Sequence, residues 1–441
     1  MNPFFTCRLG LVAVLCLIPQ LVNASLIRDT ELEAGLEHIS APLTRAAGFG
    51  VNSVDIRIII DPTYNAFVAG EMTIYIHSGL LVDARSTEEI LGVIAHELGH
   101  LKAGHVPRRQ EAIREASGAT ALAAIAALAL TAGGAPGDAA MGVIIGGSDQ
   151  AKRRVLGSFR RDESVADELG LRLLDEAEVS SRGLAEMMRR MAAQRALPEN
   201  HQSIYYQTHP GAGERMSVYN DHLAKSPHAD SHLPKNIDDL ARRLIDKLRA
   251  YTAAPQTLLQ TPERLAPENR TYGQAVAHFR RGDLKAALGL IDTALTVAPD
   301  DPFYHEFRGD VLISMARPAA AAEAYQTAVN LRPDSPQILL NLGRALLATG
   351  ERASLARAIE AITAALTGEP NWAFAYRQLA IAYGRAGKLA LADLNLAQEA
   401  LLMQDRQQAA RMAKRALSRT DTPDDVRNRA NDILFSLGKT E

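Results

Sequence analysis

Apolar residues along the first hundred positions follow two different periods, and each period predicts a different kind of element. Residues 28–47 carry apolar side chains at helical spacing with acidic residues early, which predicts an opening helix. The runs 54–60 and 72–78 are rich in β-branched residues and flank the turn-prone segment DPTYN, which predicts two strands. The stretch STEEILGVIAHELGHLKAGH again has helical character, and Ser86 is a favourable N-cap for it.

The pattern changes after this helix. Residues 117–147 are rich in Ala and Gly, with two apolar arms around GGAPGD that are each too short to span a membrane. They predict a buried helical hairpin or, alternatively, a lid or membrane-touching hairpin over a nearby site. Further along, 153–196 is predicted to be helical, 198–234 to form a polar loop region, and 237–251 to form another helix.

The second half of the chain is an internal repeat. Small residues recur at intervals of 34, 34 and 37 positions, at Gly282, Ala316, Gly350 and Gly387. Prolines recur in the same phase, at Pro299, Pro333 and Pro370. Each unit therefore predicts two helices, the first ended by a small residue and the second by a proline, with a three-residue insertion in the second helix of one unit. The pattern resembles the tetratricopeptide repeat, as four units over 269–406 and a capping helix pair over 407–438.

The N-terminus has the features of a secretory signal. Arg8 precedes an apolar run at 9–22, and Ala24 closes it with a plausible cleavage site, which predicts export to the periplasm. An uncleaved anchor is the alternative, although the run falls short of a span of about 20 residues. Both cysteines, Cys7 and Cys16, lie in this segment, so the mature chain is predicted to contain no disulfide.

Length and composition indicate a soluble protein of two domains. The chain has 441 residues, of which 47% are hydrophobic and 22% charged. Its net charge of -3, without any long basic block, argues against nucleic acid as the main partner. We predict a signal peptide at 1–24, a mainly α domain with a small β-sheet at 25–255, and an α-helical repeat solenoid at 256–441.

The segment HELGH carries the most specific chemistry. On a helix, His96 and His100 are four residues apart and share one face, so both imidazoles can bind the same Zn²⁺. Glu97 lies beside such a metal without being required as a ligand, and it can accept a proton from a water that the metal acidifies. His105 is five residues from His100, off the ligand face, which indicates a place at the helix end or behind the ligands.

A catalytic zinc site needs a third protein ligand from elsewhere. In SFRRDESVADELG, Glu163 and Asp167 are four residues apart on a predicted helix and share a face. Glu163 is the candidate ligand, and Asp167 could accept a hydrogen bond from a ligand imidazole. Acidic pairs at this spacing are also common on solvated helix faces, so the spacing alone leaves both interpretations open.

Several motifs together resemble the M48 zinc metallopeptidases. These are HELGH, the E-x-x-A-D run that ends at Asp167, the tripeptide THP that contains His209, Arg215 five residues after that proline, and NAF at 65–67. The resemblance covers 28–222 and implies a zincin-like α+β fold with one Zn²⁺ bound by His96, His100 and Glu163. It implies that Glu97 is the general base and that His209 can cap the metal as a removable inhibitory ligand. It also implies that Arg215, like Asp167, lies behind the metal ligands.

The two halves together predict a periplasmic endopeptidase that degrades misassembled envelope proteins. Stacked helix pairs form a concave face for peptides or partner proteins, and tethering that face to a protease concentrates its substrates. Candidate lining residues are Tyr304, Arg308, Asn341, Arg344 and Arg377. The resemblance implies outer-membrane β-barrel precursors as substrates and the β-barrel assembly machinery as a partner. The alternatives are a chaperone or adaptor with a latent metal site and a membrane-embedded peptidase, against which the lack of long apolar runs argues.

Overall fold

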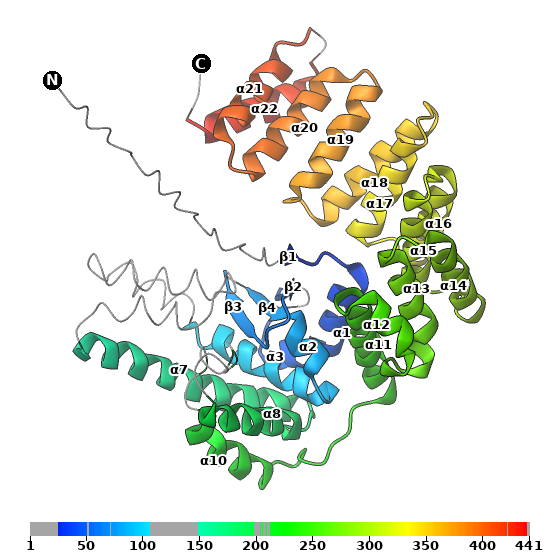
Figure 1. The fold of residues 1–441 in the computed structure, drawn as a ribbon. Helices are drawn as coiled ribbons and strands as arrows, with labels where there is room; N and C mark the ends of the chain where they lie inside the picture. Colours follow the sequence, from blue (N-terminus) through cyan, green and yellow to red (C-terminus); the bar gives the residue numbers. More distant parts are fainter. Residues whose placement is uncertain are drawn as a thin grey trace, which may run out of the picture.

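The computed structural model describes residues 25–50, 53–70, 72–105, 149–197, 203, 205, 209, 212–420 and 422–438. Within these ranges the chain is mainly helical, with one small sheet in its N-terminal half and a curved stack of helix pairs in its C-terminal half (Figure 1). The fold therefore confirms the predicted class. The predicted signal peptide at 1–24 and the predicted hairpin or lid at 117–147 lie outside the described residues.

The sheet has four strands in the order β1-β2-β4-β3. They are β1 (Ser25–Leu26), β2 (Asp55–Ile60), β3 (Ala66–Ala69) and β4 (Thr73–His77). The central pair β2 and β4 is parallel, whereas β1 and β3 run antiparallel to their neighbours. The sequence predicted β2 and β4 but neither outer strand, because these strands are too short to show an alternating pattern. Strand β3 is left at one edge of the sheet.

Three helices accompany the sheet. Helix α1 (Thr30–Ala46) is capped by Asp29, whose side chain accepts a hydrogen bond from the backbone N–H of Leu32. Helix α2 (Ser78–Asp83) follows β4 directly. Helix α3 (Thr87–Lys102) begins at the predicted cap Ser86. Most of α3 is buried, because its middle turns, ILGVIA, are apolar on every side and pack between the sheet, α1 and later helices.

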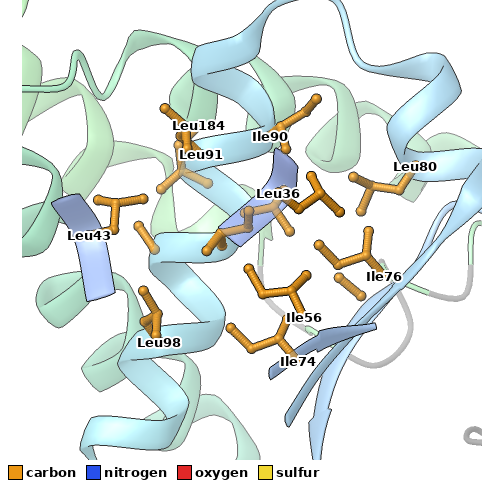
Figure 2. Packing of buried hydrophobic residues seen from close by; sticks show 14 of the residues in the cluster. Leu36, Leu43, Ile56, Ile74, Ile76, Leu80, Ile90, Leu91, Leu98 and Leu184 are labelled. Carbon is orange, nitrogen blue, oxygen red and sulfur yellow. The ribbon is translucent and has the colours of Figure 1, made fainter. Parts of the chain in front are cut away.

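The core of the N-terminal half lies between α1, α3 and the sheet. Figure 2 shows its buried side chains pointing toward one another from these elements, from α2 and from α8 (Arg182–Ala193): Leu36, Leu43, Ile56, Ile74, Ile76, Leu80, Ile90, Leu91, Leu98 and Leu184. Alternate residues of β2 and β4 supply the sheet's contribution, as expected for a sheet with one face on the core. This packing fixes α3 against the sheet, and α3 carries HELGH.

The later helices of this half are α7 (Asp149–Glu176), α8 (Arg182–Ala193), the short η1 (Gln194–Ala196), α10 (Ala212–Leu223) and α11 (Lys235–Thr252). Helix α10 corrects the prediction that 198–234 is a loop region throughout. Its sequence, AGERMSVYNDHL, is too polar to show an apolar stripe. It is nevertheless anchored because Arg215 and Tyr219 point into the protein.

The C-terminal half begins with short elements, α12 (Pro255–Gln260), η3 (Pro262–Arg264) and η4 (Pro267–Asn269). Five helix pairs follow within the described part of the chain (Figure 1). They are α13 (Arg270–Arg280) with α14 (Leu284–Val297), α15 (Pro302–Ser314) with α16 (Pro318–Leu331), α17 (Pro336–Ala348) with α18 (Ser354–Gly368), α19 (Ala373–Arg385) with α20 (Leu389–Leu402), and α21 (Arg406–Leu417) with α22 (Asp424–Ser436).

The predicted turn residues adopt the backbone conformation that ends a helix tightly. Gly282, Ala316, Gly350 and Gly387 have φ values of 80°, 56°, 74° and 75°. These values lie in the left-handed region, which glycine tolerates best. The predicted insertion is placed differently: two of its three residues lengthen the turn between α17 and α18, and only one lengthens α18.

Charged side chains join the two halves of the chain. Arg243 of α11 bonds both Glu31 of α1 and Asp301, the residue that caps α15. Arg28 forms an ion pair of 2.7 Å with Glu369, the residue that follows α18. Helix α11 also contributes buried residues to the hydrophobic cores of both halves. Among the described helices, none is long and apolar enough to cross a membrane.

Candidate metal centre

Helices α3 and α7 cross so closely that their backbones touch. A Cβ atom on Gly99 would lie 2.5 Å from the carbonyl oxygen of Ala166, and one on Gly170 would lie 3.1 Å from that of Ala95. Gly99 therefore permits a contact that any side chain would prevent, and Gly170 lies at a contact that leaves little room for one. The crossing brings Glu163 and Asp167 of α7 beside His96 and His100 of α3, all of them buried.

Four side chains converge at this crossing. His96 Nε2 lies 3.1 Å from His100 Nε2, 3.2 Å from His209 Nδ1 and 3.3 Å from Glu163 Oε2. Glu163 Oε1 lies 3.4 Å from His100 Nε2, and Glu163 Oε2 lies 2.9 Å from His209 Nδ1. One potential ligand atom from each of the four residues lies within 4.8 Å of all the others.

These distances fit a single metal ion. Donor atoms bound tetrahedrally at about 2.0–2.1 Å from Zn²⁺ are separated from each other by about 3.3 Å. Hydrogen bonds alone do not account for the cluster, because His96 Nε2 can carry at most one proton yet has three such neighbours. Two or three imidazoles with one carboxylate are also the donor set that zinc prefers at catalytic sites. The residues therefore fit the metal that their sequence motif implies.

Asp167 lies behind His96. Its Oδ1 is 3.0 Å from His96 Nδ1, a contact that favours a proton on Nδ1 and leaves Nε2 free to face the cluster. Tyr219 of α10 donates its hydroxyl to the same carboxylate oxygen. Arg215, one turn earlier on α10, bonds Asp167 at 3.0 Å and Glu163 at 3.1 Å. The two acidic residues of α7 are thus held in place from α10.

The surrounding charges shift the pKa values of these groups. Burial by itself lowers the pKa of His96, but hydrogen bonds with Asp167 and Glu163 outweigh it and raise this pKa to about 10. Burial would raise the pKa of Glu163, yet the facing His209 and His100 hold it well below its usual range. Glu163 is therefore an anion in this cluster, where a bound cation would offset its charge.

His100 is supported by a separate chain of contacts. Its Nδ1 lies 2.9 Å from Nδ1 of His105, whose Nε2 lies 3.6 Å from Asp162 of α7. His105 is buried but has no atom in the four-residue cluster. This agrees with the prediction that His105 lies at the helix end behind a ligand.

Glu97 and His209 lie on the side of the cluster that faces strand β3. Glu97 is buried, and its Oε1 is 3.6 Å from His209 Nε2. That same Nε2 lies 3.4 Å from the backbone oxygen of Ala66 on β3. The His209 ring stacks on Tyr205 with centroids 4.2 Å apart. His209 therefore lies between the candidate base and the sheet edge while its Nδ1 faces the other three donors.

Sequence reasoning missed the residues that support the site from α10 and from the segment before it. Tyr219 follows Arg215 by four residues, which is a helical spacing, but the assignment of this region to a loop hid that signal. Tyr205 lies four residues before the His209 ring on which it stacks, and the assignment of this region to a loop hid that spacing as well. In the repeats, Tyr304 and Asn341 are buried, which contradicts their predicted place on an open binding face.

Comparisons with known proteins agree with this geometry. Residues 28–221 match peptidase family M48, and residues 309–350 match the TPR repeat. The chain is 22% identical over 358 residues to the beta-barrel assembly-enhancing protease of Yersinia pestis, covering 79% of this chain and 72% of that protein.

Two further relatives match shorter stretches. A putative beta-barrel assembly-enhancing protease of Vibrio cholerae serotype O1 is 26% identical over 297 residues, which is 66% of this chain and 60% of that protein. The metalloprotease LoiP of Escherichia coli strain K12 is 29% identical over 185 residues, which is 41% of this chain and 68% of that protein.

Proposed function

We propose that the chain is a zinc-dependent endopeptidase that degrades misassembled envelope proteins, on the premise that residues 28–221, which match peptidase family M48, form a metallopeptidase domain. One observation carries the proposal: four buried donor atoms converge with mutual distances that suit one ion, and Glu97 lies beside them. His96, His100 and Glu163 are the proposed ligands of a single Zn²⁺. The domain boundaries near 255 stay a prediction.

Each residue of the site has a separate role in the proposed reaction. When bound, the metal supplies Lewis acidity, which acidifies a water and polarises the scissile carbonyl. Glu97 accepts the proton of the attacking water and passes it to the departing amine nitrogen. Asp167 holds the His96 ring in the tautomer that binds metal through Nε2, and Arg215 balances the charge of Glu163 and Asp167.

His209 is the proposed fourth ligand of the resting enzyme. Its Nδ1 is 2.9 Å from Glu163 Oε2, and its ring separates the cluster from the backbone oxygen of Ala66. A substrate carbonyl needs the position that this ring fills, so His209 has to leave before cleavage. The resting enzyme would then be self-inhibited, and its activation would depend on whatever moves the segment around His209.

The proposed cellular location and the proposed substrates are supported by other observations. The features of 1–24 support export and cleavage after Ala24, and therefore a periplasmic enzyme. Two relatives are named beta-barrel assembly-enhancing proteases, which supports outer-membrane β-barrel precursors as substrates and the β-barrel assembly machinery as a partner. A peripheral membrane contact through 117–147 is part of the same proposal. The repeats would bind substrate or partner and bring it to the metal site.

The alternative function is a periplasmic chaperone or adaptor whose metal site stays latent. The contact of His209 with the cluster supports this alternative as well, because a permanently capped metal cannot cut. The two functions differ in their dependence on Glu97. An adaptor tolerates the loss of this carboxylate, whereas a protease does not.

The test compares zinc content and casein cleavage for the wild type, Glu97→Gln and His209→Ala. We expect one zinc per chain in all three, no cleavage by Glu97→Gln, and faster cleavage by His209→Ala. His222→Ala is the matched control, because His222 lies on α10 against Asp175, away from the cluster. Absence of zinc from the wild type would refute the metal assignment. Zinc without cleavage, even in His209→Ala, would favour the adaptor.

A further inference from the structure

His105 faces the proposed ligand His100 from the turn that ends helix α3. The helix ends at Lys102, and Gly104 then adopts a φ of 65°, in the left-handed region that glycine tolerates best. This turn lets His105 point back toward the helix, so its Nδ1 lies 2.9 Å from Nδ1 of His100. The two rings are tilted by 70°, with centroids 5.0 Å apart. Both residues are buried, so the contact is shielded from solvent.

Asp162 of α7 lies at the other nitrogen of the His105 ring. Its Oδ1 is 3.6 Å from His105 Nε2, which is longer than a hydrogen bond but close enough for the carboxylate to attract a proton onto this nitrogen. Asp162 directly precedes the proposed ligand Glu163 in the sequence, yet Glu163 Oε1 faces His100 Nε2, at 3.4 Å. Two adjacent carboxylates of α7 therefore face the two ends of one chain of rings.

The short contact between the two Nδ1 atoms has room for a single proton when both rings are neutral. A neutral imidazole carries one proton, so His100 can bind metal through Nε2 only if its proton is on Nδ1. His105 must then accept at Nδ1 and carry its own proton on Nε2, the nitrogen that faces Asp162. The opposite arrangement places the proton of His105 on Nδ1 and that of His100 on Nε2, where it blocks the metal. The tautomer of His105 thus decides whether His100 can be a ligand.

We propose that Asp162 is a positioning residue of the metal centre and acts on His100 through His105. The carboxylate favours a proton on His105 Nε2, and the free Nδ1 of His105 then favours the metal-binding tautomer of His100. The two ligand histidines are oriented differently, because Asp167 contacts His96 directly whereas Asp162 is one ring removed from His100. This inference rests on the proposed zinc site and adds a requirement for metal binding outside HELGH.

The first test measures the zinc affinity of the full chain by competition with a zinc-binding dye. We expect Asp162→Asn, which keeps the shape of the side chain and removes its charge, to raise the Kd for zinc by about tenfold. Glu168→Gln is the matched control on the same helix, because the Glu168 side chain is 71% exposed and lies 4.0 Å from Arg172. This control should bind zinc like the wild type. An unchanged Kd for Asp162→Asn overturns the proposal.

A double variant shows whether Asp162 acts through His105. Loss of a negative charge near a cation can weaken zinc binding by Coulomb attraction alone, without any part for His105. In His105→Phe the ring nitrogens are absent, so the addition of Asp162→Asn should change the zinc Kd by less than about twofold. The same loss of affinity in both backgrounds would mean that Asp162 acts only through its charge, which contradicts a role through His105.

Nitrogen NMR of the histidine rings in the zinc-loaded full chain reads the tautomer directly. The signals of His105 are assigned by their loss in His105→Phe. We expect a neutral His105 ring with its proton on Nε2 and an unprotonated Nδ1. A proton on Nδ1 of His105 overturns the proposal, whatever the zinc affinities of the variants.

Stability separates positioning of the metal from a role in the fold. The Asp162 side chain is 18% exposed, and we expect metal-free Asp162→Asn to melt at the Tm of the metal-free wild type. An equal fall in the Tm with and without zinc would assign Asp162 to the fold instead. If the wild type binds no zinc, the proposed metal site fails together with this inference. If the wild type binds zinc and Asp162→Asn binds it equally well, this inference alone fails.

Discussion

A Cβ atom added to Gly99 would lie 2.5 Å from the carbonyl oxygen of Ala166, so the helix that carries HELGH touches α7 backbone to backbone. Gly99 is thus required for the close packing of these two helices, and it also lies next to the proposed ligand His100 in the sequence. On α7, Glu163 lies three residues before Ala166, and Asp167 lies one residue after it. The distance between the two helices at Gly99 therefore sets the distance between the histidines and the acidic residues.

Gly99→Ala should separate α3 from α7 and damage the metal centre. The obstacle is backbone on both sides, so relief requires a shift of a whole helix, at a cost of about 1–3 kcal/mol for overpacking. We expect a lower Tm and less than one zinc per chain by atomic absorption. Gly289→Ala is the matched control, because this helical glycine has no atom within 4 Å of the added Cβ. A Gly99→Ala protein that melts and loads zinc like the wild type would contradict the packing argument.

Asp167→Asn should weaken metal binding without unfolding the chain. The variant loses the carboxylate that lies 3.0 Å from His96 Nδ1, so the ring is no longer fixed in its metal-binding tautomer. Loss of such a supporting group typically reduces metal affinity by about 10–100-fold. Competition with a zinc-binding dye measures this affinity. Asp175→Asn, two turns further along α7 and facing His222, should bind zinc like the wild type, and equal losses in both variants would rule out a specific role.

Removal of the metal should destabilise the N-terminal half more than the repeats. Without a metal, the buried carboxylate of Glu163 keeps Arg215 at 3.1 Å but loses the positive charge of the ion, whereas the repeats have hydrophobic cores of their own. A ligand present at 100 times its Kd stabilises the folded state by about 2.7 kcal/mol. We expect a chelator to lower the Tm of one calorimetric transition, and added zinc to restore it. A thermogram that chelation leaves unchanged would mean that the cluster holds no metal.

Arg243→Ala should loosen the joint between the two halves. Arg243 bonds Glu31 and Asp301 and lies over the ring of Tyr304, with Cζ 4.6 Å from its centroid. Among the described residues, its removal leaves Lys247 alone to balance the buried Glu31, and breaking such a pair typically costs about 3–5 kcal/mol. Faster proteolysis between 252 and 269 would report the loosening.

Arg242→Ala provides the comparison for this joint. Arg242 is the adjacent residue, but its pairs with Asp238 and Glu268 are exposed and should contribute about 0–1 kcal/mol. Its proteolysis rate should therefore match that of the wild type. Equal rates for the Arg243 and Arg242 variants would show that the joint does not depend on Arg243.

The sequence by itself determined the parts of the protein that depend on spacing along one element. His96 and His100 share a face because they are four residues apart on a helix, and Glu163 and Asp167 do so for the same reason. The repeats follow from a period of 34 residues, which places Gly282 and Gly350 at turns with positive φ. Such patterns are local, so they can be read before the chain folds.

The tertiary structure decided everything that joins distant elements. Helix α10 forms despite its polar sequence because Arg215 and Tyr219 find partners on α7. His209 reaches the cluster, and Asn65 remains without a partner, because α3, α7 and strand β3 meet in one place. No periodicity encodes such contacts, since His209 and the Ala66 carbonyl that it faces are 143 positions apart along the chain. They arise from the packing of whole helices, which at Gly99 depends on the absence of a single side chain.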